Sequence, residues 1–171
     1  MPTTALKWLT VMRHAHAEAH RAGRDDFARE LDARGRKEAE RMARVATTLG
    51  LRPAPLLASP AARTRATAET LAQALGLGAE QLCFEPRLYN ADLETLVELL
   101  QALQPTVQEV LLVGHNPGVS ELVGWLAGTE PRRMPPAGLC RLQAELGDWS
   151  GLERGAFAAE RLRWPGEAAD R

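Results

Sequence analysis

The stretch Trp8-Leu9-Thr10-Val11-Met12-Arg13-His14-Ala15 indicates the kind of fold that this sequence adopts. Its first residues are apolar or β-favouring, so they predict a buried strand over Leu6–Met12 that ends at a charged residue. Ligands of open α/β sheets bind beyond the carboxyl ends of the strands, which is where Arg13 and His14 stand. A permanent cation beside an imidazole at that place suits phosphoryl chemistry.

Later in the chain, two segments repeat this arrangement of an apolar run, polar residues and the start of a helix. They are Ser59-Pro60-Ala61-Ala62-Arg63-Thr64 and Gly114-His115-Asn116-Pro117. In the first of them we expect Ser59 to be the N-cap of the helix, with Pro60 at the first helical position. If the three strands end at one edge of a sheet, the arginines and histidines of these segments converge there, beside helix N-termini that favour an anion.

Strand and helix patterns alternate along most of the chain. Helices are predicted over residues 32–50 with Asp32 as N-cap, 59–76, 92–105 with Asp92 as N-cap, and 116–128. Strands are predicted over residues 6–12, 56–58, 81–85, 109–113, 139–146 and 156–164, and loops over 15–30 and 128–138. The alternation indicates an α/β fold, a three-layer α/β/α sandwich around a mainly parallel sheet. The segment Glu167–Arg171 is expected to be a frayed tail.

Composition narrows the classes of partner and compartment. At 171 residues without a break in composition, the chain is expected to form a single domain over residues 1–171. A net charge of −1 provides no general field for nucleic acid or an anionic membrane surface, so an anion site must be local. The cysteines, Cys83 and Cys140, form neither a disulfide framework nor a metal-type spacing. We find no secretory signal and no apolar run of membrane-spanning length, so we expect a cytoplasmic protein.

The converging side chains have the chemistry of a phosphate pocket. The guanidinium groups of Arg13 and Arg63 can hold phosphoryl oxygens in planar, bidentate contacts and neutralise charge in the transition state. A neutral histidine is nucleophilic near pH 7, and its attack on phosphorus divides one difficult hydrolysis into two easier transfers. Of His14 and His115, one would attack phosphorus and the other would donate hydrogen bonds to the phosphoryl group.

These segments resemble the motifs of the histidine phosphatase superfamily. Arg13-His14-Ala15 is similar to the Arg-His-Gly signature of that family, and Gly114–Pro117 to its Gly-His-Asn-Pro segment. The segment that starts at Ser59, with Arg63, Thr67 and Ala68, is similar to its Ser-Pro-x-x-Arg…Thr-Ala segment. Within the family the chain most resembles the small SixA-type phosphohistidine phosphatases. Further similar stretches extend over nearly the whole chain, at Leu31…Arg34-Gly35, Leu88-Tyr89-Asn90-Ala91, Pro136-Ala137-Gly138 and Trp149…Gly155.

The resemblance implies a phosphoglycerate mutase-like fold and specific roles for the converging residues. His14 would be the phosphorylated nucleophile, and Arg13, Arg63 and His115 would hold the phosphoryl group. Asn116 of the last segment is added to the residues expected to bind substrate. The implied activity is a metal-independent phosphatase, without cofactor, that acts on phosphohistidine in a phosphorelay or phosphotransfer protein and releases inorganic phosphate. We expect no nucleic-acid or membrane partner.

The sequence departs from the family pattern at four positions. Ala15 replaces the usual glycine, Glu30 stands at an expected proline, and Pro136 stands at an expected threonine. Asn90 stands where larger members that cleave phosphate esters carry a glutamate acid. An alkoxide leaving group needs a positioned acid, whereas the more basic nitrogen of a phosphoramidate takes a proton more easily, so this departure favours phosphohistidine as the substrate.

The remaining acids and the chain length around the site leave three functions open. By elimination, Asp25, Asp26 and Glu85 are candidate acids, and His16 is a candidate for the pocket rim. Residues 91–113 have room for one helix and one strand, so no inserted domain is expected to cover the pocket. Besides the phosphohistidine phosphatase, the alternatives are a phosphatase or mutase for a small phosphate ester and a phosphate-binding module without turnover.

Overall fold

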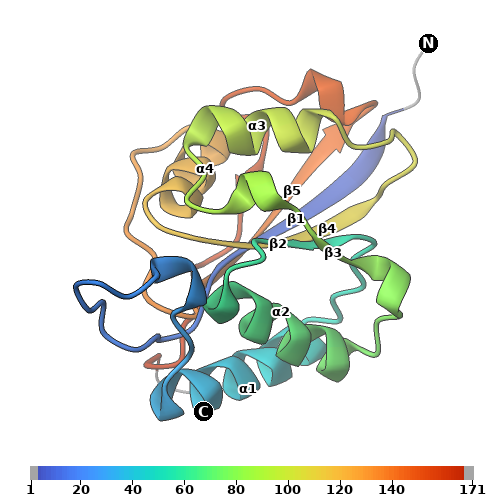
Figure 1. The fold of residues 1–171 in the computed structure, drawn as a ribbon. Helices are drawn as coiled ribbons and strands as arrows, with labels where there is room; N and C mark the ends of the chain where they lie inside the picture. Colours follow the sequence, from blue (N-terminus) through green and yellow to red (C-terminus); the bar gives the residue numbers. More distant parts are fainter. Residues whose placement is uncertain (1–3, 168–171) are drawn as a thin grey trace.

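The computed structural model describes residues 4–167 and has a central sheet between two layers of helices (Figure 1). The strands are β1 (Ala5–Arg13), β2 (Leu56–Ala58), β3 (Leu82–Phe84), β4 (Glu109–Gly114), β5 (Leu139–Leu146) and β6 (Ala158–Ala159). The α-helices are α1 (Ala33–Thr48), α2 (Ala62–Leu75), α3 (Leu93–Gln101) and α4 (Gly118–Ala127). Short 3₁₀ helices are η1 (Asp26–Ala28), η2 (Ala79–Gln81), η3 (Pro86–Leu88) and η4 (Trp149–Gly151). Among these described residues, no helix is both long and apolar enough to span a bilayer.

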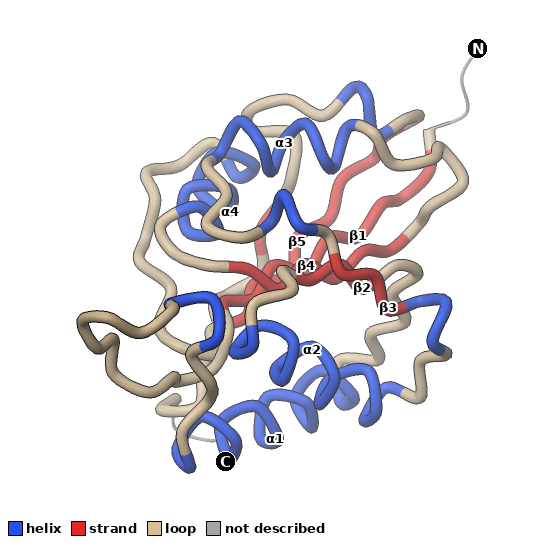
Figure 2. Tube along the Cα trace, in the orientation of Figure 1, coloured by secondary structure: helices blue, strands red, loops and turns tan. Residues whose placement is uncertain are grey.

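The sheet has the order β3-β2-β4-β1-β5-β6. Strands β1 to β4 pair with one another in parallel, whereas β5 pairs antiparallel with β1, and β6 pairs antiparallel with β5 at that end of the sheet. A mainly parallel sheet has to be covered on both faces, because its strands are apolar on both. Helices α1 and α2 cover one face and α3 and α4 the other (Figure 2), which confirms the predicted three-layer α/β/α fold.

Alternation along the central strands separates the two apolar layers. Val110 and Leu112 of β4 belong to the core cluster that includes residues of α3 and α4, whereas Leu111 and Val113 belong to the cluster that includes residues of α1 and α2. Each helix contributes a stripe of apolar residues at helical spacing; in α1 this stripe contains Met42. Burial on both faces makes the position of β4 in the sheet well determined, which matters because this strand leads into the site.

The predicted ends of three helices agree closely with the structure. The side chains of Asp32 and Asp92 accept hydrogen bonds from the amides of Gly35 and Thr95, so both are N-caps as predicted. Gly128, expected to stop α4, adopts the left-handed conformation at its C-cap, with φ of 69°.

The predicted start of α2 is wrong. The helix begins at Ala62 with Ala61 at the N-cap position, not at Pro60 with Ser59 as its cap. The hydroxyl of Ser59 instead accepts a hydrogen bond from the amide of Ala61 and is paired with the imidazole of His115. The residue that looked like a helix cap therefore belongs to the site.

A continuous strand over residues 156–164 is also wrong. Ala159 pairs with Leu142 of β5, and Arg163 forms an isolated bridge with Leu139. From Ala159 to Arg163 the chain advances four residues, whereas from Leu142 to Leu139 β5 advances three. The extra residue interrupts the ladder of hydrogen bonds, as a β-bulge at a sheet edge does. Of the tail expected to fray, residues 168–171 lie outside the described part of the chain.

Candidate active site

The site begins where three adjacent parallel strands end. Strands β2, β4 and β1 are neighbours in the sheet, and their carboxyl ends lie at the same edge. Beyond the strand ends, the amide of His14 donates to the carbonyl of Gly114 at 3.1 Å, and that of Ser59 to the carbonyl of Val113 at 3.2 Å. The residues that follow β1 and β2 are therefore held against β4 by backbone hydrogen bonds.

A pocket of about 710 Å³ opens at this edge. It is lined by Arg13, His14, His16, Ala17, Asp26, Arg29, Arg63, Asn90, His115, Asn116, Arg133, Pro135 and Pro136. The structure thus brings together all five residues that the sequence placed in the site, from β1, α2 and the turn after β4. Their roles stay predictions.

His14 is held in one tautomer by its own backbone. Its side chain is nearly buried, and Nδ1 lies 2.7 Å from the carbonyl oxygen of Ala15, so Nδ1 carries the proton and donates it. Burial, together with the nearby charges of Arg63 and Arg13, lowers the pKa of His14 to about 4. The imidazole is therefore neutral at pH 7, and its Nε2 has a free lone pair, as a nucleophile requires.

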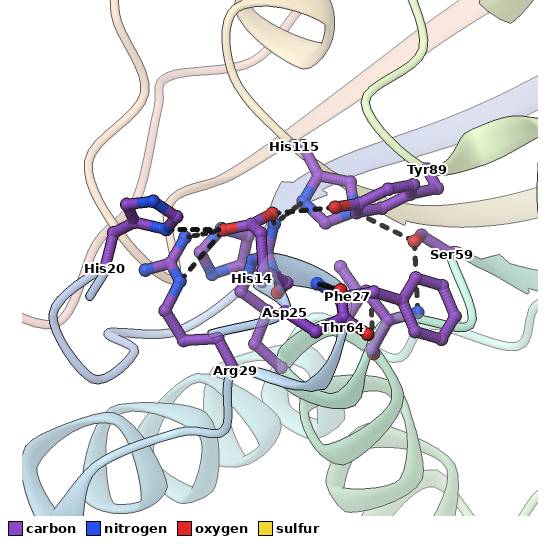
Figure 3. A network of polar contacts seen from close by, with 12 residues as sticks. His14, His20, Asp25, Phe27, Arg29, Ser59, Thr64, Tyr89 and His115 are labelled. Atoms are coloured by element: carbon purple, nitrogen blue, oxygen red, sulfur yellow. Dashed lines mark hydrogen bonds and ion pairs between the residues drawn. The ribbon is translucent and has the colours of Figure 1, made fainter. Parts of the chain in front are cut away.

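His115 is the second buried imidazole, and both of its ring nitrogens have protein partners. Nη2 of Arg63 donates to Nδ1 at 3.2 Å, so the proton is on Nε2, which donates to the hydroxyl of Ser59 at 2.8 Å. Burial and the charge of Arg63 lower the pKa of His115 to about 3. The ring centroids of His14 and His115 are 5.3 Å apart, and Figure 3 shows the two rings in one network of polar contacts.

Arg63 projects from the first turn of α2 and is only 2% exposed. The same helix also fixes the residue after His14, because the hydroxyl of Thr67 accepts from the amide of Ala15 at 3.1 Å and donates to the carbonyl of Arg63 at 2.8 Å. Ala15 is fully buried, which explains why only a small residue fits there. The departure from glycine at this position thus leaves the turn intact.

Arg13 and Asn116 share one partner, the carbonyl oxygen of Met134. Nη1 of Arg13 donates to it at 3.0 Å and the amide nitrogen of Asn116 at 2.9 Å. The hydroxyl of Ser120 donates to the other side of the Asn116 amide and accepts from the amide of Met134. These contacts tie the loop of residues 128–138 to the pocket, and they give Asn116 a structural function besides its predicted contact with substrate.

Three residues around Arg63 that were not predicted to bind substrate form a cluster of polar contacts. Asp26 accepts hydrogen bonds from Nη2 of Arg63 at 3.0 Å, from Nε of Arg29 at 3.1 Å and from the hydroxyl of Tyr89 at 2.8 Å. The ring of Tyr89 also meets that of His115 edge to face, with centroids 5.5 Å apart. Arg29 directly precedes Glu30, which stands at a proline expected from the family pattern, and Tyr89 belongs to the family-like stretch Leu88-Tyr89-Asn90-Ala91. Neither signal indicated a contact with Arg63.

The contacts of the three candidate acids argue against a positioned proton donor. Burial on its own would raise the pKa of Asp26, but the hydrogen bond from Tyr89 and the charges of Arg63 and Arg29 lower it to about 2. Asp25 and Glu85 each cap a 3₁₀ helix by accepting a backbone amide, and neither lines the pocket.

Two further positions of the pocket lining, His16 and Asn90, were named in the sequence analysis. His16 lies on the rim, as expected, and pairs with Asp32 at 2.6 Å. Asn90 also lines the pocket, in the left-handed region with φ of 49°, a conformation that asparagine tolerates better than glutamate.

Within residues 4–167, no inserted domain covers the pocket. Between Ala91 and Val113 the chain forms α3 and enters β4, which confirms the expectation of one helix and one strand in this interval. Over residues 4–167, no group of three or more histidine, cysteine or acidic side chains is arranged to hold a metal ion.

Comparisons with known proteins agree with this arrangement. Residues 9–102 match the profile of the histidine phosphatase superfamily, branch 1. The fold is similar to SixA of Agrobacterium tumefaciens, with a TM-score of 0.77 and 30% identity over 97% of this chain and 100% of that one. It is also similar to a protein histidine phosphatase SixA complexed with tungstate, with a TM-score of 0.78 and 26% identity over 92% of this chain and 97% of that one.

A relative from Arabidopsis thaliana extends the comparison beyond solved structures. It is an uncharacterized chloroplastic protein that is 29% identical over 136 residues, which are 74% of this chain. The matched region spans 62% of the length of that relative. The profile match and the two SixA structures, together with the site geometry, lead to one conclusion: this chain belongs to the histidine phosphatase superfamily and has its phosphoglycerate mutase-like fold in the SixA form.

Proposed function

We propose that this protein is a phosphatase that hydrolyses phosphohistidine on a protein, through a phosphorylated His14 and without a metal ion. The observation that carries the proposal is the state of His14, a neutral imidazole whose proton is fixed on Nδ1 and which lines a pocket together with Arg13 and Arg63. The family of the chain and its SixA relatives support phosphatase chemistry for such a pocket.

In the first step, the lone pair of Nε2 of His14 attacks phosphorus. The bond between phosphorus and the nitrogen of the substrate imidazole breaks, and the electron pair stays on that nitrogen, which takes a proton from solvent. His14 then carries the phosphoryl group on Nε2 and the proton on Nδ1, so its ring becomes cationic. The carbonyl of Ala15, which already accepts from Nδ1, stabilises this charge as it develops.

In the second step, a water molecule attacks the phosphorylated His14. The bond between phosphorus and Nε2 breaks, the electron pair returns to the ring, and the surplus proton of the water goes to solvent. Inorganic phosphate is the product. Arg13 and Arg63 neutralise the phosphoryl oxygens in both steps.

The substrate class follows from the missing acid and from the shape of the site. Asp26 is held as a carboxylate, and Asn90 stands at the rim, so among the described residues that line the pocket no carboxylic acid is positioned to protonate an alkoxide. A phosphoramidate needs such a donor less, because its nitrogen is more basic. In the described part of the chain no inserted domain closes over the pocket, so a side chain on the surface of a phosphorelay or phosphotransfer protein can reach His14. We further propose that residues 1–171 form one domain and act in the cytoplasm.

The test is an assay of phosphate release from a phosphohistidine protein in the presence of a metal chelator. We expect His14→Ala to lose several orders of magnitude in rate. Wild type mixed with labelled phosphoprotein should carry an acid-labile, base-stable label. His20→Ala is the matched control, because this exposed histidine does not line the pocket that contains His14 and touches it only through Asp26, with Nδ1 3.7 Å from a carboxylate oxygen. This variant should keep the label.

The same assay with small substrates tests the substrate class. The proposal predicts faster phosphate release from the phosphohistidine protein than from sugar phosphates or p-nitrophenyl phosphate. Faster turnover of the esters would indicate a phosphatase or mutase for a small phosphate ester instead. Phosphate binding without any labelled His14 would indicate a binding module without turnover.

A further inference from the structure

Asp26 is the anion that the arginines of the pocket bind in this structure. Nη2 of Arg63 contacts its carboxylate at 3.0 Å, and Nη1 of Arg63 donates to its backbone carbonyl at 2.7 Å. On the other carboxylate oxygen, Nε and Nη2 of Arg29 lie at 3.1 and 3.0 Å. The guanidinium nitrogens that donate to Asp26 are of the kind that bind phosphoryl oxygens in other proteins.

Those contacts come from a segment that the core does not fix. Asp26 lies in η1, within the loop of residues 15–30, and its side chain is 29% exposed, whereas that of Arg63 is 3% exposed. None of the three residues of η1 is buried. The carboxylate can therefore leave Arg63 through a local movement of the loop, without any change in the sheet edge.

The balance of charges in the pocket gives the Asp26 carboxylate an effect on phosphate binding. Among the described residues that line it, Arg13, Arg29, Arg63 and Arg133 are cations and Asp26 is the one carboxylate. A phosphate ion that entered would meet strong attraction from the arginines and repulsion from Asp26. Four arginines without a compensating anion would hold free phosphate tightly, and a tightly held product slows turnover.

We propose that Asp26 is a resident anion that competes with the phosphoryl group for Arg63 and Arg29 and so promotes the release of inorganic phosphate. This inference rests on the proposed function, because it assigns a part in the second step to a residue that does not react. When phosphate leaves, the carboxylate returns to the two guanidinium groups and keeps them paired. Tyr89 guides this return, since its hydroxyl donates to the same carboxylate at 2.8 Å.

The experiment is equilibrium binding of inorganic phosphate, measured by calorimetry on wild type, Asp26→Asn and Asp25→Asn. Asp26→Asn keeps the shape and removes the charge, so we expect phosphate to bind roughly 10- to 100-fold more tightly. Asp25→Asn is the matched control: it removes the same charge one residue away, where the carboxylate caps η1 and contacts no arginine of the pocket, and we expect a change of less than about twofold. Unchanged or weaker phosphate binding in Asp26→Asn would overturn the proposal.

Turnover and a bound structure give two further readouts. With a phosphohistidine protein, Asp26→Asn should show a lower kcat and a lower KM together, because product release becomes slow; a lower kcat with unchanged phosphate binding would contradict the proposal.

If Asp26→Asn does not fold, a crystal structure of the wild type with tungstate decides. We expect the carboxylate to have moved out of hydrogen-bond distance of Arg63, and tungstate bound with the Asp26 contacts intact would refute the proposal. Phosphate binding needs no turnover, so these outcomes are separate from those that test phosphohistidine hydrolysis.

Discussion

The site is assembled from two regions that are held in different ways. At the sheet edge, His14, Arg63 and His115 are 7%, 2% and 4% exposed, and backbone hydrogen bonds to β4 fix the turn that carries His14. In the loop of residues 15–30, Asp26 and Arg29 are partly exposed and are held mainly by polar contacts of their side chains. The groups proposed to react with phosphorus or to hold it therefore lie buried at the sheet edge, whereas the proposed competing anion, Asp26, lies in a partly exposed loop.

Removing a buried arginine of the sheet edge should have the largest effect. Arg63→Ala deletes the guanidinium proposed to hold the phosphoryl group and also frees Asp26, so we expect kcat/KM to fall about 10²- to 10³-fold. Arg65→Ala, on the same helix with an exposed side chain that pairs with Glu69, should stay within about twofold of wild type. Both variants are measured in parallel, with circular dichroism to check folding. Equal losses would contradict the idea that the buried arginine of the sheet edge matters more than an exposed arginine of the same helix.

The enzyme should stay active to a lower pH than it would if His14 had the pKa of an ordinary histidine. The pKa of His14 is lowered to about 4, so the neutral nucleophile persists as the pH falls from 8 to about 5 and is lost only near pH 4. A free histidine would already be mostly protonated at pH 5, which makes the expected difference roughly 30-fold at that pH. The measurement is the rate on a phosphohistidine protein from pH 4 to 8, with His14→Ala subtracted as the non-enzymatic background. A midpoint near pH 6.5 would show that the sheet edge does not desolvate His14.

The same shift predicts that acid lowers stability. In the unfolded chain His14 and His115 bind protons below their ordinary pKa of about 6.5, whereas in the folded protein they do so only near pH 4 and 3. Their contribution to the free energy of unfolding is therefore complete above pH 6.5 and decreases as the pH falls toward 4. Urea midpoints of the wild type should fall over this range, and those of His115→Gln should fall less. The opposite slope would contradict the predicted directions.

Losing an arginine of the loop should cost less than losing one of the sheet edge. Arg29→Ala removes a partly exposed cation of the pocket together with one partner of Asp26, so we expect kcat/KM to fall about tenfold. Arg24→Ala, an exposed residue of the same loop, should have no measurable effect. If the loss from Arg29→Ala reaches that from Arg63→Ala, the loop holds the phosphoryl group as firmly as the sheet edge does.

The smallest effect is expected for the partner of His115. Ser59→Ala removes the acceptor of the Nε2 proton, which leaves the ring less firmly oriented but keeps Arg63 on Nδ1, so we expect a threefold to tenfold fall in kcat. The ¹⁵N shifts of the His115 ring should change, whereas those of His14 should not. Unaltered His115 shifts would mean that Ser59 does not position this ring.

Much of the fold could be predicted because its signals are local. The apolar runs and caps of α1, α3 and α4 have clear sequence patterns, and so do the glycines that end helices. The errors arose where a tertiary partner overrode a local preference: the hydroxyl of Ser59 pairs with His115, and an extra residue interrupts the pairing beside β5. Neither partner can be recognised from neighbours in the sequence.

The residues of the site that could be predicted lie at the sheet edge, and those that could not lie in or beside the loop of residues 15–30. The five predicted residues follow strands or begin helices, where the topology alone brings them together at one edge. Asp26, Arg29 and Tyr89 come from segments without periodic signals, and their meeting depends on the path of the loop of residues 15–30. The sequence raised Asp26 as a possible acid, but its pKa depends on contacts that only the folded chain shows.

The carbonyl of Met134 has one more consequence, for how related chains can differ in length. Because Arg13 and Asn116 both donate to this single oxygen, an inserted or deleted residue between Gly128 and Met134 would displace it from both donors at once. Exposed side chains of that stretch that do not line the pocket, such as Arg132, can be exchanged freely, whereas Arg133 lines the pocket and contributes to its charge. Natural and engineered variation should therefore alter the chemistry of this rim while the number of its residues stays constant.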